Sequence, residues 1–272
     1  MRKILVAFDG NQYAQGAMQF AKRLNDNEKI SLTGLFLPQV ALSSLWSYAD
    51  AMTGATIVPF IESENAELIE KNIAQFEEFC SDHRISHNVI KAFFDPALPE
   101  LQKQTRFADI AIIGSETFYQ NIGTHHSEYL REALHSAECP VIVVPESYSF
   151  PEANILAYDG SESSVFAIKQ FIYLFPEFSD NPTTLVTTNP SDNYGENSAH
   201  IRDLVSAHFS SLSFLNLDID PKKYFATWMS EKKSSILVCG AFSRSMISQL
   251  FRQSFVEDVL RDHKIPVFIS HR

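Results

Sequence analysis

The sequence predicts a parallel α/β protein made of two similar halves. Short apolar runs, which are typical of strands, alternate with segments whose apolar residues recur at helical spacing. Parallel strands need crossover connections, so this alternation indicates βαβ units. The pattern restarts after a linker at 145–151, and we therefore expect one domain at 1–146 and a second at 152–272.

The first half opens with a continuous apolar run, 3–8, which ends at Asp9 and Gly10. A run without polar alternation predicts a strand buried on both faces of a sheet. The further strands expected in this half are 30–37, 87–94, 110–113 and 140–144. The expected helices are 14–24, 66–80, a segment starting near Pro96, and 127–137.

Residues 38–60 interrupt this alternation with an apolar segment in which Asp50 is the only charged residue. So apolar a loop is unfavourable in water, and we expect it to form an interface between the two halves or between two chains. A lid over the first domain's site and a short helix packed on its own domain are the alternatives. As a surface between chains, the segment would support a homodimer.

The second half repeats the order of elements. Its first strand, 154–158, ends at Asp159, and a helix with apolar residues on one face follows. The further strands expected here are 184–188, 211–217, 236–239 and 267–269. The further helices are 200–209, 221–229 and a segment that starts at Ser254.

A comparison of landmarks shows that the halves are a tandem duplication. Three pairs of residues correspond: Asp9 with Asp159, Gly114 with Gly240, and Pro140 with Pro266. The first pair is 150 residues apart, and the other two pairs are each 126 residues apart. The first half is thus longer by 24 residues, and the excess lies in the stretch that contains 38–60.

The composition indicates which binding partners and which cellular compartment to expect. The formal net charge of −11 argues against nucleic acid or an anionic membrane as the main partner, since both attract basic surfaces. Cys80, Cys139 and Cys239 lie far apart, which predicts buried thiols in a reducing compartment rather than disulfides or a zinc site. Met1 leads directly into a short strand without a signal peptide or a membrane span, so we expect a cytoplasmic protein.

Two signatures, each present in both halves, resemble those of a known family. ILVAFDG at 4–10 and ILAYDGS at 155–161 each end a strand with an aspartate. Cys139-Pro140-Val141 and Ile265-Pro266-Val267 each lead into the last strand of a half. In these features the chain resembles the tandem-domain universal stress proteins.

The resemblance implies two Rossmann-like domains of the adenine nucleotide α hydrolase-like kind. Each domain would contain five mostly parallel strands in the order 3-2-1-4-5, with helices on both faces of the sheet. The fifth strands, 141–144 and 267–269, would pair within the chain across a pseudo-twofold axis, so that the two domains form an intrachain pseudo-dimer.

Nucleotide-binding members of this family carry the motif G-x2-G-x9-G-[ST] after the fourth strand. The second half has Gly240, Ser243, Gln253 and Ser254 at these positions. The first half has Gly114, Thr117, Ser127 and Glu128. Two glycines are replaced in the second half, whereas the first half places a carboxylate where it would repel a phosphate. The resemblance therefore implies an adenine-nucleotide site in the second domain and a degenerate site in the first.

The site residues that follow from the resemblance are Asp159, Gly240, Ser243, Ser245, Ser254 and Phe255, with Asp9 and Gly114 in the first domain. Asp159 would lie near the base or ribose, Gly240 would admit the phosphates, and Ser243 and Ser254 would hold them. Each type of residue also has a role that needs no ligand. The aspartates can be turn or cap residues, and Ser254 with Glu257 forms a capping box.

No nucleophile–base pair or paired carboxylate stands out, and His125, His126 and His135 lack partners at metal-ligand spacing. We therefore expect neither a catalytic nor a metal site. The expected function is that of a stress-response regulatory protein with ATP or another adenine nucleotide as ligand and no required cofactor. A ligand-free scaffold that acts through protein contacts and dimerisation is the alternative. Nucleotide hydrolysis is a third hypothesis, based on analogy with a related fold.

Overall fold

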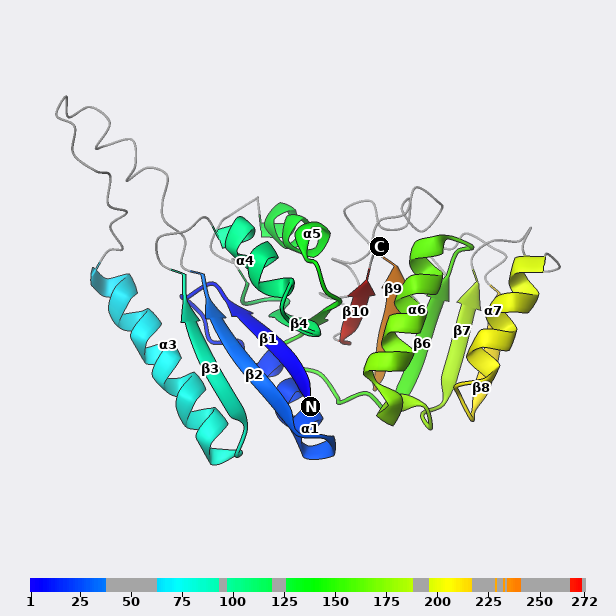
Figure 1. Ribbon diagram of the computed structural model, residues 1–272, viewed down its shortest axis with the longest axis horizontal. Coiled ribbons are helices and arrows are strands. Elements are labelled where there is room, and N and C mark those ends of the chain that lie inside the picture. The colour runs from blue at the N-terminus through cyan, green and yellow to red at the C-terminus, as the bar shows by residue number, and fades with distance from the viewer. Residues whose placement is uncertain are drawn as a thin grey trace, which may run out of the picture.

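The computed structural model describes residues 1–37, 63–92, 97–118, 126–187, 196–216, 228, 232, 234–240 and 265–270. Over these residues, ten strands form one sheet in the order β3-β2-β1-β4-β5-β10-β9-β6-β7-β8 (Figure 1). The insertion at 38–60 and the segment 241–264 lie outside the described residues, as does nearly all of the predicted helix 221–229.

Each half has the strand order that the resemblance implies, and its strands run parallel. From the outer edge inward, the first half contains β3 (Ser86–Lys91), β2 (Ile30–Phe36), β1 (Arg2–Phe8), β4 (Ile110–Gly114) and β5 (Val141–Val144). The second half contains β8 (Leu212–Asn216), β7 (Thr183–Thr187), β6 (Ala153–Tyr158), β9 (Ser235–Gly240) and β10 (Val267–Ser270).

The two halves join where β5 and β10 pair in antiparallel orientation. Val141 lies opposite Ile269, and Ile142 lies opposite Phe268. This register confirms the predicted pairing of the fifth strands. Because two equivalent strands pair antiparallel, a pseudo-twofold axis relates the halves, and one continuous sheet replaces two separate ones.

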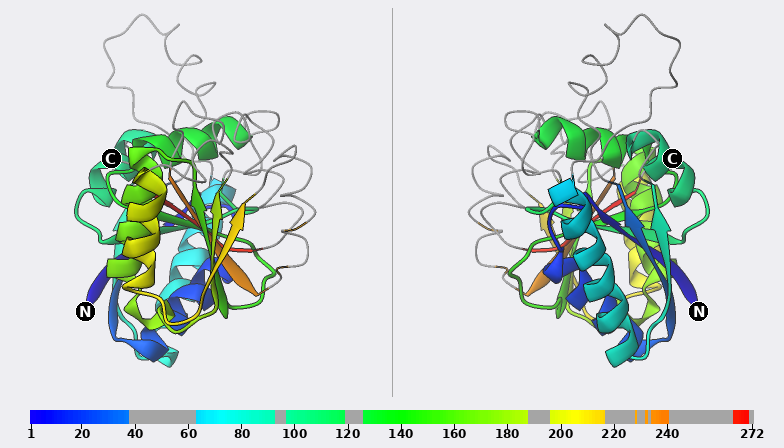
Figure 2. Two further views of the ribbon diagram at one scale, coloured as in Figure 1. Left: turned by 90° about the vertical axis from the view of Figure 1, so that its right-hand side faces the viewer. Right: turned by 90° about the vertical axis from the view of Figure 1, so that its left-hand side faces the viewer.

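Helices cover both faces of the sheet, as predicted (Figures 1 and 2). One hydrophobic core lies under α1 (Gln15–Asn27), α3 (Ser63–Asp82), α6 (Glu162–Leu174) and α7 (Glu196–Ser206). A second core lies on the opposite face, under α4 (Ala97–Thr105) and α5 (His126–Ser136). The first core extends across the seam between the halves, since one cluster of buried residues contains Ile142 and Val144 of β5 together with Phe268 of β10.

Arg2, at the start of β1, ties the first half to the second. Its Nη1 donates to the carbonyl oxygen of Leu174, the last residue of α6, at 2.6 Å. Its Nη2 lies 2.8 Å from a carboxylate oxygen of Glu177, and its guanidinium lies 5.4 Å from the centre of the Phe175 ring. The Arg2 side chain is only 10% exposed, so these contacts are shielded from water.

The predicted element boundaries differ from the observed ones by up to four residues, most of all at α7. The helix predicted at 200–209 is α7 (Glu196–Ser206), because its first turn carries only the small Ala199 and no larger apolar residue to mark it. The strand predicted at 87–94 is β3 (Ser86–Lys91), and the last two residues of the predicted strand, 93 and 94, lie outside the described residues.

The cysteines are free thiols, and Cys80 and Cys239 are buried as predicted, whereas Cys139 is partly exposed. Burial, together with the nearby Asp159, raises the pKa of Cys239 to about 12. A thiol with so high a pKa is protonated at neutral pH and is a poor nucleophile. Among the described residues, no helix is long and apolar enough to span a bilayer.

Candidate ligand site

Asp9 ends β1 in a tight turn. Only 2% of the residue is exposed, and its Oδ1 accepts the backbone N–H groups of Asn11 at 2.9 Å and Gln12 at 3.1 Å. Gly10 adopts a φ of 86°, which disfavours any residue with a side chain. Asn72 of α3 donates to the carbonyl oxygen of Gly10 and holds the turn against that helix. These contacts give Asp9 the turn role that needs no ligand.

Asp159 has the same role of a turn residue at the end of β6. Its Oδ1 accepts the N–H of Ser161 at 3.0 Å and the hydroxyl of Ser161 at 2.6 Å. Ser161 is in turn the N-cap of α6, because its Oγ accepts the N–H of Ser164 at 3.1 Å. Gly160 between them has a φ of 84°. Asp159 therefore orients the cap of α6, and it lies at the carboxyl edge of the sheet, where open α/β sheets bind ligands.

Gly240 and Gly114 have a packing role that the sequence does not reveal. A Cβ on Gly240 would lie 2.6 Å from the carbonyl carbon of Ser163 and 2.7 Å from the backbone nitrogen of Ser164. A Cβ on Gly114 would lie 3.0 Å from the Cβ of Ala14, the residue that corresponds to Ser164. In both halves the glycine thus lets the fourth strand approach the start of the first helix. The interpretation of Gly240 as a glycine that only admits phosphate is incomplete.

In the first half, the chain's own side chains occupy the space beside Gly114, at the amino end of α1. A Cβ on Gly114 would collide with the Thr117 hydroxyl and would lie 3.5 Å from Oε1 of Glu146. Oε2 of Glu146 accepts the N–H of Gly16, near the amino end of α1, at 3.1 Å. A helix amino end favours anions, and here the linker supplies one from within the chain.

A second carboxylate completes this cluster. Oε2 of Glu116 accepts the backbone N–H of Glu146 at 2.9 Å and the hydroxyl of Ser115. Two carboxylates beside one helix end would repel a phosphate group. The structure thus places Glu116 and Glu146, which sequence analysis did not name, beside the amino end of α1. The degenerate first site stays a prediction. The motif residues Ser127 and Glu128 lie in α5, and their side chains are outside the described part of the structure.

Glu146 makes the stability of the first half depend on pH. Burial raises the pKa of Glu146 above its ordinary value of 4.5, and the Glu116 carboxylate raises it further, while the hydrogen bond from Gly16 opposes them. A carboxyl group whose pKa is higher in the folded state stabilises the fold fully below its unfolded pKa. It loses that contribution as the pH rises through the folded pKa.

We therefore expect the free energy of unfolding of Glu146→Gln to fall less than that of the wild type as the pH rises above 4.5. Between pH 4 and pH 8 the variant should become more stable relative to the wild type. The measurement is the free energy of unfolding by urea at several pH values in this range. Parallel curves for the two proteins would contradict the assignment of this pH dependence to Glu146.

At the corresponding sequence positions, the second half carries neither of these two glutamates, although Glu162 lies in the first turn of α6. By the constant offset of 126 residues, Glu116 corresponds to Phe242 and Glu146 to Arg272, which replaces an acid by a base. Both residues lie outside the described part of the chain, so this comparison concerns the sequence alone. The backbone N–H groups of Glu162 and Ser163, the first two of α6, donate no hydrogen bond to the residues that the structure describes.

The predicted site residues fall into two groups. Asp159 and Gly240 meet at the amino end of α6, one from β6 and the other from β9. Ser243, Ser245, Ser254 and Phe255 lie outside the described residues and stay predictions. Within the described part of the chain, no group of three or more potential metal ligands occurs.

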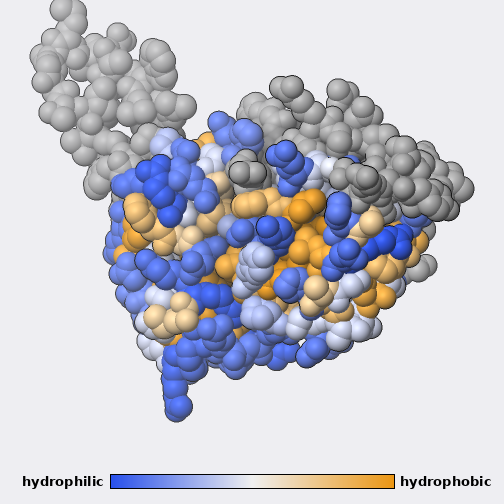
Figure 3. Space-filling model, turned by 45° about the vertical axis from the view of Figure 1, so that its right-hand side comes forward, coloured by the Kyte–Doolittle hydropathy of each residue, from blue (hydrophilic) through white to orange (hydrophobic). Residues whose placement is uncertain are grey.

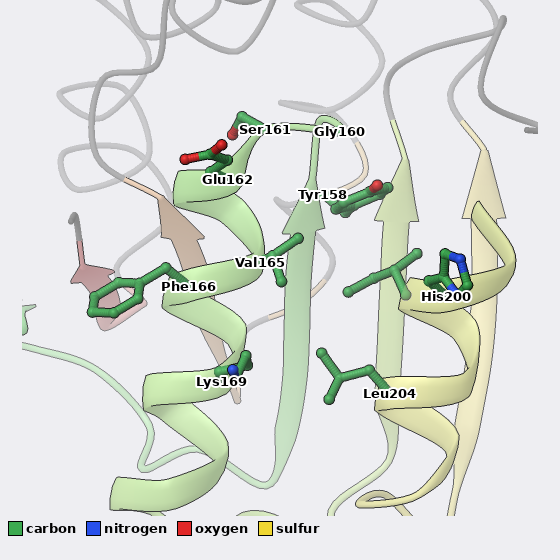
Figure 4. A pocket seen from close by; sticks show the side chains of 10 residues that line it. Tyr158, Gly160, Ser161, Glu162, Val165, Phe166, Lys169, His200 and Leu204 are labelled. Carbon is green, nitrogen blue, oxygen red and sulfur yellow. The ribbon is translucent and has the colours of Figure 1, made fainter. Parts of the chain in front are cut away.

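Sequence analysis missed a pocket of about 530 Å³ between α6 and α7 (Figure 4). Figure 3 shows that hydrophobic residues gather on one face of the molecule. Tyr158 and Ser161 line the pocket from the turn after β6, and Val165, Ile201 and Leu204 line it from the helices. No local sequence pattern marks this pocket, because its lining comes from the turn after β6 and from two separate helices.

These features define a class of protein: two parallel α/β halves fused through their fifth strands, with one half closed at its carboxyl edge. No family model matches the chain, and no curated protein matches it in sequence. The fold is nevertheless found in solved structures.

The chain is similar over its whole length to a universal stress protein from Archaeoglobus fulgidus DSM 4304, with 16% identity, a TM-score of 0.73 and 96% of that chain covered. A protein from Pseudomonas aeruginosa UCBPP-PA14 assigned to the universal stress proteins matches the whole chain at 13% identity and a TM-score of 0.59, with 93% of its own length covered. The chain thus has the tandem fold of the universal stress proteins, which confirms the fold that the sequence resemblance implies.

The same fold also occurs in another context. The cytoplasmic domain of a prokaryotic cation chloride cotransporter matches 98% of this chain and 94% of its own, with 11% identity and a TM-score of 0.56. The fold therefore does not decide the function, which has to be argued from the site.

Proposed function

We propose that this chain is a cytoplasmic regulatory protein of the stress response that binds an adenine nucleotide through its second half. The observation that carries the proposal is the difference between the halves. In the first half, Glu146 supplies a carboxylate to the amino end of α1. In the second half, α6 presents a capped amino end beside Asp159 and Gly240, and sequence register places Arg272 at the position of Glu146.

The proposed roles follow from the geometry of this helix end. Asp159 faces the ribose or base, and the first N–H groups of α6 face the anion. Gly240 brings the end of β9 against α6, so that the segment after it starts next to these N–H groups. Ser243, Ser245 and Ser254 supply hydroxyls to the phosphates, and Phe255 follows in the next helix. The role is one of binding, without a catalytic step.

The test is a thermal shift with ATP, ADP and AMP at millimolar concentration. We expect a rise of the melting temperature, and we expect the double variant Ser243→Ala/Ser254→Ala to reduce it by weakening binding about tenfold or more. Thr117→Ala, which changes the first-half counterpart of Ser243, is the matched control and leaves the shift intact. A wild-type protein that shows no shift with any of the three nucleotides contradicts the proposal.

A ligand-free scaffold is the second candidate, and a specific observation favours it. Asp159 caps a turn and Gly240 packs on α6, so both residues have structural roles that require no nucleotide. On this hypothesis, ATP leaves the melting temperature unchanged, whereas deletion of 38–60 converts a dimer to a monomer in sedimentation experiments. Nucleotide binding together with an unchanged oligomeric state in the deletion variant would exclude it.

A further inference from the structure

Over the described residues, the sheet has two edges, and the third strand of each half forms one of them (Figure 1). These strands are β3 and β8, at opposite ends of the sheet. The fifth strands, in contrast, pair with each other at the centre. An edge strand presents a row of backbone N–H and C=O groups to which a further strand can be added. The two third strands are therefore the places where this sheet can be extended.

Alternate residues of β8 direct their backbone groups away from β7. The pairing is parallel, and the N–H of Thr183 donates to the carbonyl oxygen of Ser211, so the backbone groups of 213 and 215 also face β7. The outward row consists of Leu212, Phe214 and Asn216. Within the described part of the chain, no strand pairs with this row. Its centre is Phe214.

The other edge of the sheet provides a matched comparison. The strand registers place Val89 of β3 at the position equivalent to Phe214. The outward row of β3 also contains His87 and Lys91, and Lys91 forms an ion pair with Glu70 at 2.8 Å. The sequence of β8, LSFLN, has no charged or titratable residue. Charged side chains, lysine above all, protect edge strands from pairing, so β3 has a protection that β8 lacks.

Phe214 adds an exposed aromatic ring to the unprotected edge. The residue is 43% exposed, whereas its counterpart Val89 packs against the first core. The guanidinium of Arg202, from α7, lies 4.3 Å from the centre of the Phe214 ring, and this cation–π contact holds the ring beside the edge. Contact with a second strand would remove the ring from water, which is favourable.

We propose that β8 pairs with β8 of a second copy of this chain, antiparallel and centred on Phe214. A twofold axis at this residue places Leu212 of each copy opposite Asn216 of the other. Because the outward row is symmetric about Phe214, each outward N–H and C=O group then has a partner. The two Phe214 rings lie on the same face of the joined sheet, and cross-strand aromatic pairs stabilise such a contact.

The seam inside the chain shows that this sheet joins equivalent strands in the same way. There β5 and β10 pair antiparallel, and one apolar core continues across them. The net charge of −11 opposes the association of two copies, but the uncharged β8 places no like charges within the strand pair. Twofold pairing uses up the β8 edge and β3 is protected, so we expect dimers rather than longer assemblies.

Sedimentation velocity between micromolar and submillimolar protein concentration measures this association. The strand has five residues, a length of about 17 Å, so we expect a monomer that becomes a dimer within this range. Phe214→Lys removes the ring and places like charges at the twofold axis, and it should weaken dimerisation about tenfold or more. Phe107→Lys, which changes another exposed phenylalanine (63% exposed), is the matched control and leaves the dimer intact.

Melting curves of both lysine variants at low concentration verify that they fold. A wild type that stays monomeric throughout the range overturns the proposal, and so does a folded Phe214→Lys variant that dimerises like the wild type.

Cysteine crosslinking tests the register and does not depend on the lysine variant. In a hydrogen-bonded antiparallel pair, opposite Cα atoms are about 5.5 Å apart, which a disulfide can span. Oxidised glutathione should therefore link Phe214→Cys into a covalent dimer on a non-reducing gel. Leu212→Cys is the register control, because its two copies would lie about 14 Å apart across the axis. The wild type, with its three free cysteines, gives the background. Equal crosslinking of the two variants, or none of Phe214→Cys above the background, contradicts the proposed pairing.

The proposed dimer involves neither the nucleotide site nor the insertion at 38–60. Deletion of 38–60 should leave the concentration dependence of sedimentation unchanged, and ATP should not alter it. If the deletion variant is monomeric while Phe214→Lys still dimerises, the contact between copies belongs to the insertion, and the assignment to β8 is wrong.

Discussion

Gly240→Ala lowers the free energy of unfolding by about 3 kcal/mol. The added methyl group would lie 2.6 Å from the carbonyl carbon of Ser163, and 2.7 Å and 2.8 Å from the Ser164 nitrogen and the Ser163 oxygen. All three are backbone atoms in the first turn of α6, so relief requires movement of the helix rather than of a side chain. Because α6 packs on β9 and β10, this movement also disturbs the core beneath it. Urea unfolding followed by circular dichroism measures the effect.

Gly114→Ala is the matched control, since Gly114 holds the same place in the first half. The atom in its way is the Thr117 hydroxyl, which a side-chain rotation removes, and Ala14 lies at 3.0 Å. We expect a loss of about 1 kcal/mol for this variant. If both substitutions lowered the free energy of unfolding by the same amount, the contact with the α6 backbone would not explain the loss of stability at Gly240.

Arg2→Met lowers the free energy of unfolding by about 3 kcal/mol, because it removes one partner from contacts shielded from water. The substitution leaves the Leu174 carbonyl at the end of α6 without its donor and the Glu177 carboxylate without its cation. The side chain of Glu177 is only 18% exposed, so water replaces the lost partner poorly. Since Arg2 belongs to the first half and both partners to the second, we also expect the two halves to unfold less cooperatively.

Arg106→Met provides the comparison for Arg2. Arg106 donates two hydrogen bonds to the carboxylate of Glu138, at 2.6 Å and 2.7 Å. The geometry of this ion pair is therefore at least as favourable as that of Arg2 with Glu177. The Arg106 side chain is 57% exposed, however, and exposed ion pairs contribute little. A loss at Arg106 as large as that at Arg2 would show that burial does not explain the effect of Arg2.

Much of the fold could be predicted from the sequence, because its causes are local or repeated. The run at 3–8 is buried in the structure except for Lys3, as a strand covered on both faces requires. The offsets of 150 and 126 residues placed equivalent strands in register, and the sheet order confirms them. The antiparallel pairing of β5 and β10 came from the family resemblance, since neither strand identifies its partner by its own pattern.

Less of the candidate site could be predicted. Asp9 and Asp159 were found because each ends a strand beside a glycine, which is a local pattern. The role of Glu146 was not foreseen, because its partner Gly16 lies 130 residues away in the chain and the linker has no periodicity that indicates where it packs. The pocket between α6 and α7 was not foreseen either, because its lining comes from the turn after β6 and from two helices that lie apart in the sequence.

The sequence by itself determined the fold class, the duplication, the strand order within each half once the resemblance was drawn, and the difference in charge between the two carboxyl edges. Hydrophobic periodicity and register carry this information because they depend on neighbouring residues or on a constant offset. The tertiary structure decided why Gly240 is a glycine, how Glu146 reaches the amino end of α1 and where the pocket between α6 and α7 lies. Those three facts depend on distances between segments remote in sequence, which only the packed chain defines.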